Sequence, residues 1–171
     1  MCRFGYKKVY IITTILKYLK YYIPGLTSIL FIVILLMGEN YPTYFLIGFS
    51  LFIIVGDIIF PRDKEIEKFS YPSLLNLSIY INLPILFILV LLVVSIFSHN
   101  LSQWYIEVLD SYFYIDFMQI KNSFNRIDKI SLIIQTALSI GILGTVPGHE
   151  LTHRKKNKFD MFVGNWLLAF S

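Results

Sequence analysis

The residues best suited to chemistry lie in one short segment near the end of the sequence. His149 and His153 are two of the three histidines in the chain, and Glu150 lies between them. On an α-helix, residues four apart share one face and lie about one turn from each other, so both imidazoles can direct a nitrogen at the same ion. Imidazole binds zinc and iron alike. The spacing therefore predicts a metal-binding pair and leaves the metal open.

The same segment fits a second pattern, H-E-x-x-H, in which two histidines hold zinc and the glutamate acts as general base of a protease. The helix of such a protease generally continues with apolar packing residues, whereas here residues 154–158 read Arg-Lys-Lys-Asn-Lys. A membrane-embedded zinc metalloprotease using His149, Glu150 and His153 stays open as an alternative. So does a non-catalytic membrane protein in which the two histidines are unrelated.

The composition indicates what surrounds this segment. Of the 171 residues, 56% are hydrophobic and only 15% are charged, which is too apolar for the water-facing surface of a globular protein of this size. The net charge is +4, but the basic residues stand between apolar runs, as membrane-flanking charges do. We therefore expect a lipid bilayer as partner and no nucleic acid. The only cysteine is Cys2, so no intrachain disulfide can form.

The apolar residues form runs that are continuous rather than alternating, and each run is near the ~20 residues that a helix needs to cross a bilayer. These runs cover 21–37, 44–60, 73–97 and 130–147, and another begins near Phe159. The sequence therefore predicts an all-α, polytopic transmembrane bundle with about four membrane helices and the start of a fifth, in a single domain over 1–171. The short segment 38–42 predicts a helical hairpin, and Pro84 predicts a kink in the third helix.

The basic residues also predict the orientation of the bundle. Residues 1–20 carry five Lys and Arg, the first loop carries none, and the second carries three, so the N-terminus is predicted to be cytoplasmic. The basic cluster after His153 places the end of the fourth helix on the same side. The long connection 98–129 mixes aromatic and acidic residues, which is typical of a segment at the membrane surface. We expect an integral protein of a membrane such as the bacterial inner membrane.

The C-terminal part of the sequence resembles a known family. Gly148-His149-Glu150-Leu151-Thr152-His153-Arg154, with the residues that follow it, is similar to the first histidine box and next segment of the membrane-bound alkane monooxygenases and their relatives in the fatty acid desaturase superfamily. The following residues that share in the similarity are Asp160, Val163, Gly164 and 166–171. Upstream, Gly56-Asp57 resembles the family's aspartate-bearing end of the second membrane helix, although Pro61-Arg62-Asp63 replaces the usual Gly-Glu-Asp.

This resemblance implies a function. His149 and His153 would be iron ligands of a di-iron centre, Glu150 would hydrogen-bond a ligand imidazole, and Arg154 would be a cation at the helix end. The enzyme would hydroxylate or desaturate an alkane or fatty-acyl chain with O2, drawing electrons from a rubredoxin- or ferredoxin-type donor. The Glu150-Leu151 pair favours the hydroxylase branch.

Two imidazoles are too few for two irons, because each iron needs several ligands. The family's further histidine boxes would lie downstream of Ser171. His99 cannot replace them, because the third connection is predicted at the opposite end of the bundle from His149. We therefore expect this chain to be the N-terminal part of an oxygenase, with the first third of its site, and to be inactive by itself.

Overall fold

The computed structural model describes residues 18–59, 69, 71–154 and 157–170. Every regular element within these ranges is helical, which confirms the all-α class. Several sequence predictions concern residues outside the described ranges: the basic N-terminus up to Lys17, the segment with Arg62 and Asp63, and Lys155 and Lys156.

Four helical stretches are long and apolar enough to cross a membrane: Lys20–Met37, Tyr41–Ile59, Pro72–Phe97 and Arg126–His153. The first joins a short 3-10 turn, η1 (Lys20–Tyr22), to α2 (Ile23–Met37); the second and third are α3 (Tyr41–Ile59) and α4 (Pro72–Phe97). The fourth joins α7 (Arg126–Ser139), a π-helical stretch η2 (Ile140–Thr145) and α8 (Val146–His153).

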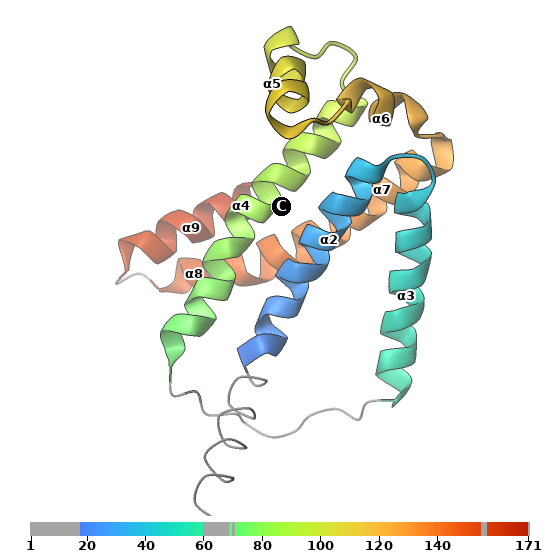
Figure 1. Cartoon of the computed structure of the whole chain (residues 1–171). Helices are drawn as coiled ribbons and strands as arrows, with labels where there is room; N and C mark the ends of the chain where they lie inside the picture. Colours follow the sequence, from blue (N-terminus) through green and yellow to red (C-terminus); the bar gives the residue numbers. More distant parts are fainter. Residues whose placement is uncertain (1–17, 60–68, 70, 155–156, 171) are drawn as a thin grey trace, which may run out of the picture.

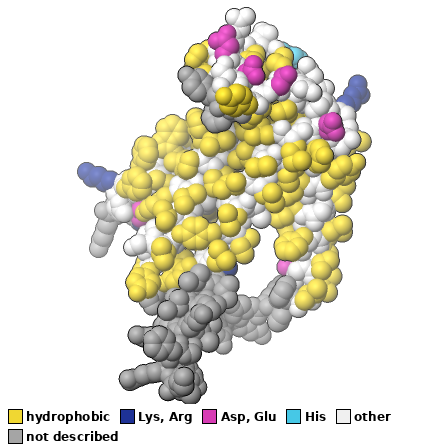
Figure 2. Space-filling model, in the orientation of Figure 1, with side chains coloured by type: hydrophobic (Ala, Val, Ile, Leu, Met, Phe, Trp, Pro, Cys, Tyr) yellow, Lys and Arg dark blue, Asp and Glu magenta, His cyan; other side chains and the backbone are white. Residues whose placement is uncertain are grey.

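The sides of these helices present hydrocarbon to their surroundings. Figure 2 shows hydrophobic side chains across the side of the bundle and acidic side chains gathered over α5 at one end. Phe52 and Ile58 on α3 are 74% and 79% exposed. Water-soluble monomers rarely leave so wide an apolar surface uncovered. The chain is therefore an integral membrane protein.

Hydrogen bonds show which helix ends lie together. At one end, the Tyr22 hydroxyl donates to the Leu74 carbonyl (2.7 Å) and the Arg154 guanidinium donates to Asn76 (2.7 Å), so the starts of α2 and α4 meet the end of α8. We call this the histidine end. At the other end, the Glu39 amide donates to the Ser123 hydroxyl (2.8 Å). This is the end over which α5 (Gln103–Phe113) and α6 (Phe117–Ser123) lie (Figure 1). His99 stands in the connection between α4 and α5.

The last helix, α9 (Lys158–Ala169), turns back beside α8 (Figure 1). It packs on α8 and α4 through an apolar cluster near the histidine end. The most buried members of this cluster are Leu86, Leu143, Leu151 and Leu167. A second apolar cluster, with Phe31, Leu35, Leu89 and Leu132 fully buried, joins α2, α4 and α7 nearer the α5 and α6 end.

Some helix bounds differ from the sequence predictions, because capping residues and prolines determine where these helices begin. The fourth helix begins at Arg126 rather than near Ile130, because Asn125 and Asp128 form a capping box. α3 takes in Pro42 in its first turn, where a missing N–H costs little. Pro147 lies inside the continuous fourth stretch, just after the π-helical residues of η2. α4 is one helix from Pro72 to Phe97, with Pro84 inside it.

Candidate metal-binding site

The two histidines of the predicted pair lie together on α8. The centroids of the His149 and His153 rings are 4.6 Å apart, and the ring planes meet at 72°. Both side chains are exposed. Neighbouring imidazoles with this freedom can share one metal ion. Within the part of the chain that the structure describes, no third His, Cys, Asp or Glu joins them in a group able to hold a metal. The residues present therefore fit two ligand positions and leave the others to further donors.

The rest of α8 explains why these side chains point outward. Leu151 is fully buried in the apolar cluster, and Gly148 is also buried, whereas His149, Glu150 and His153 are all exposed. α8 thus has a packed face, with Gly148 and Leu151, and an exposed face with His149, Glu150 and His153, which we call the chemical face. The π-helical stretch η2 lies directly before it, and such stretches are frequent at functional sites.

Two glycines bring α9 into backbone contact with the packed face of α8. A Cβ added to Gly164 would lie 2.9 Å from the Leu151 Cβ and 3.0 Å from the Gly148 carbonyl oxygen. A Cβ added to Gly148 would lie 3.0 Å from the Leu167 Cβ. Small residues permit this kind of close helix approach within membranes. The glycine pair therefore fixes α9 against the back of the helix that carries the histidines.

A polar network joins α8 and α9 next to the turn that connects them. The Arg154 guanidinium contacts the Glu150 carboxylate at 2.8 Å and the Asp160 carboxylate at 3.7 Å, in addition to its bond to Asn76. Asp160 is 3% exposed and accepts a hydrogen bond from the Tyr80 hydroxyl. A carboxylate this buried needs such partners. Arg154, Asp160, Tyr80 and Asn76 together join α8, α9 and α4 next to the histidine pair, and we call them the Arg154 network.

The structure locates the other residues singled out from the sequence. The Glu150 carboxylate is directed at Arg154 in this state, and its role beside an imidazole stays a prediction. Asp57 is exposed on α3. His99 stands between α4 and α5, and α5 lies at the end of the bundle opposite the histidine end.

Two residues of the Arg154 network, Asn76 and Tyr80, were missed by reasoning from the sequence. A signal for them does exist. They are polar and stand four apart on one face, and together with Ser78 and Asn82 they make the first half of a mainly apolar run more polar than the second. Polar groups at such positions in membrane helices generally face a partner rather than lipid.

We compared the chain with protein-family models, curated proteins and solved structures. None of the three comparisons finds a match.

Proposed function

We propose that this chain carries the first histidine pair of a membrane-bound di-iron oxygenase that hydroxylates or desaturates alkyl chains. The observation that carries the proposal is the paired, exposed imidazoles of His149 and His153 at one end of an apolar helical bundle. Ionisable groups at such positions in membrane proteins are functional far more often than elsewhere. An alkane or fatty-acyl substrate reaches such a site from the lipid that surrounds the helices.

In this proposal the protein's own residues have two tasks. His149 and His153 supply two imidazole ligands, and the Arg154 network holds α8 in place so that the imidazoles keep their separation. The iron, when bound, supplies the activation of O2 and the attack on a C–H bond. In this proposal the remaining ligands are further histidines, of the kind that the resemblance to the family implies.

The distribution of charge supports a cytoplasmic position for the site. Among the described residues, Lys20, Arg154 and Lys158 lie at the histidine end, and Lys121, Arg126 and Lys129 lie at the other end. The excess comes from the sequence, because residues 1–17, which precede α2, carry four more basic residues and residues 62–68, which precede α4, carry three more. Basic residues beside membrane helices favour the cytoplasmic side. A rubredoxin- or ferredoxin-type donor would reach the site from that side, in keeping with a bacterial inner membrane.

The position of Glu150 supports an oxygenase over a zinc protease. In the protease the glutamate must reach a metal-bound water as general base. Here its carboxylate is engaged by Arg154 at 2.8 Å. The proposal therefore gives Glu150 a place beside the site and assigns it no proton transfer.

The test uses membranes that contain the protein expressed from its complete reading frame, supplied with ¹⁸O2, a reduced carrier and alkanes or fatty acyl chains. We expect ¹⁸O-labelled alcohol or desaturated product, and iron in the purified protein. His149→Ala and His153→Ala should abolish both, whereas the matched control His99→Ala should retain both. Turnover that survives His149→Ala would overturn the proposal. Peptide cleavage that zinc restores after chelation would establish the protease instead.

A further inference from the structure

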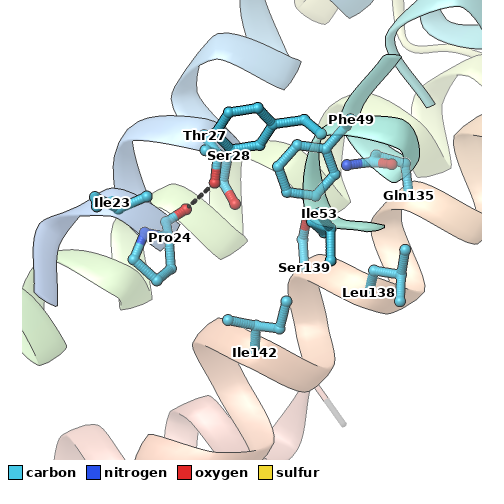
Figure 3. Close-up of a pocket in the computed structure, with 11 residues that line it drawn as sticks. Ile23, Pro24, Thr27, Ser28, Phe49, Ile53, Gln135, Leu138, Ser139 and Ile142 are labelled. Carbon is cyan, nitrogen blue, oxygen red and sulfur yellow. Dashed lines mark hydrogen bonds between the residues drawn. The ribbon is translucent and has the colours of Figure 1, made fainter. Parts of the chain in front are cut away.

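A cavity of about 190 Å³ lies between α2, α3 and the fourth membrane helix, away from the chemical face of α8 (Figure 3). Its walls are mainly hydrocarbon, with Phe49 and Ile53 from α3 and Ile142 from η2. The surface is hollowed between the lower halves of α2 and α3 (Figure 2). Among the described residues that line this cavity, none has an acidic or a basic side chain.

One side chain in the wall lacks the partner that its burial demands. Gln135 is only 4% exposed, and its Oε1 has no hydrogen-bond partner within the described part of the chain. Figure 3 shows its carboxamide extending from α7 toward Phe49. By contrast, the Thr27 hydroxyl in the same wall is satisfied by the Pro24 carbonyl at 2.9 Å. A buried amide without a partner is costly in an apolar region, so the Gln135 carboxamide marks a place where a polar group of a ligand fits.

The chemistry of the wall selects the ligand. A carboxylate would have no cation to pair with, and an ammonium would have no anion, so the polar group must be neutral. A hydroxyl suits the unpaired Oε1 of Gln135, because it is neutral and donates a hydrogen bond to that oxygen.

The rim of the cavity indicates what the rest of the ligand must be. Phe52 at the rim is 74% exposed to the surroundings of the bundle, which are lipid. A cavity of 150 Å³ holds benzene, so this one takes the hydroxyl and about six to eight heavy atoms, and the remaining chain continues into the bilayer.

We propose that this cavity binds a long-chain alcohol, with its hydroxyl on Gln135 and its hydrocarbon chain leaving between α2 and α3. The inference does not depend on the histidine pair or on iron. It predicts a preference for an alcohol over the alkane of equal length, which a plain apolar crevice would not show.

The test uses the purified full chain in lipid nanodiscs and a photoreactive diazirine analogue of decan-1-ol. We expect cross-links to peptides of α2, α3 and α7, mapped by mass spectrometry. Unlabelled decan-1-ol should compete about fivefold better than decane, which corresponds to the gain from one hydrogen bond. Gln135→Met keeps the size of the side chain and should remove that preference. Gln103→Met, an exposed glutamine on α5, should retain it.

Two further measurements show whether a lost preference for the alcohol comes from unfolding of the variant rather than from loss of the hydrogen bond. Gln135→Met removes an unpaired polar group, so its thermal unfolding should match or exceed that of the wild type. Ser139→Leu fills the cavity and should reduce labelling by the alcohol probe. Equal competition by decane and decan-1-ol in the wild type would overturn the proposal and leave a crevice that holds lipid tails or water only. Labelling that persists unchanged in Gln135→Met, or no labelling of these helices, would overturn it as well.

Discussion

The two ends of the bundle each bury one aspartate in the first turn of a helix, and the two carboxylates are satisfied differently. Asp128, 1% exposed, accepts the Thr43 hydroxyl (2.5 Å) and belongs to the capping box with Asn125. All of these partners are neutral. Asp160, 3% exposed, has the Arg154 cation and the Tyr80 hydroxyl as partners, and the exposed histidine pair lies beside it. Asp128 and its neutral partners hold the starts of α3 and α7 together. The Arg154 network instead joins α4, α8 and α9 beside the exposed histidines.

The largest expected effect comes from removing Asp160. Asp160→Ala leaves the Tyr80 hydroxyl and the half-buried Arg154 without their buried partner, and loss of a hydrogen bond to a charged group together with a screened ion pair costs about 2.5 kcal/mol. We expect a clear fall in the midpoint of thermal unfolding in detergent. Asp110→Ala, on the exposed face of α5, is the matched control and should leave the midpoint unchanged. Equal midpoints for the two variants would show that the Arg154 network does not hold α8 and α9 together.

The glycine contact gives the next largest effect. In Gly164→Ala the new Cβ meets the Leu151 Cβ and the Gly148 carbonyl at distances of 2.9 and 3.0 Å, so α8 and α9 must separate. Overpacking of this kind costs about 2 kcal/mol. Gly56→Ala on α3 meets nothing within 4 Å and should be neutral or slightly stabilising. Unfolding midpoints measured for the pair test the close approach directly. A Gly164→Ala variant as stable as Gly56→Ala would contradict it.

A smaller effect is expected at the opposite end. Asn125 accepts hydrogen bonds from the backbone amides of Ile127 and Asp128 at 2.7 and 3.0 Å. Asn125→Ala removes this cap and should cost about 1 kcal/mol. Asn125→Ser restores a capping oxygen and should recover most of the loss. Failure of the serine variant to recover stability would show that another property of Asn125, such as its bond to Asn40, decides the effect.

Much of the fold follows from the sequence because lipid imposes strong rules. A continuous apolar run in lipid must form a helix to satisfy its own backbone, so the four membrane helices could be predicted from the positions and lengths of the apolar runs. The spacing of His149 and His153 likewise predicts that their rings share one helix face, and the rings lie 4.6 Å apart.

The elements that were not foreseen depend on contacts between distant residues. The π-helical stretch η2 contains Gly141 and Gly144 and lies just before Pro147, but glycine and proline in an apolar run do not by themselves specify a π-helix. The bond between Tyr80 and Asp160 joins residues 80 positions apart. A single sequence does not report which of several polar side chains in a helix will meet. Gln135 illustrates the same limit, since its burial depends on the packing of α2 and α3 around it.

The smallest expected effect on stability, and the sharpest on chemistry, comes from the histidines. His149 and His153 are exposed, so replacing either with alanine should change the free energy of unfolding by less than about 0.5 kcal/mol. The affinity of the purified chain for Co²⁺ or Ni²⁺, measured by titration calorimetry, should nevertheless fall sharply in both variants. It should stay unchanged in His99→Ala.

The same titration separates the two ends of the bundle. Asp160→Asn keeps the shape of the side chain but weakens the hold on Arg154, and we expect about tenfold weaker metal binding, as is typical when a group that orients metal ligands is altered. Asn125→Ala lowers stability without touching α8 and should leave metal affinity unchanged. If the two variants lowered metal affinity equally, the effect of Asp160→Asn would be general destabilisation. The histidine end would then not differ in its role from the α5 and α6 end.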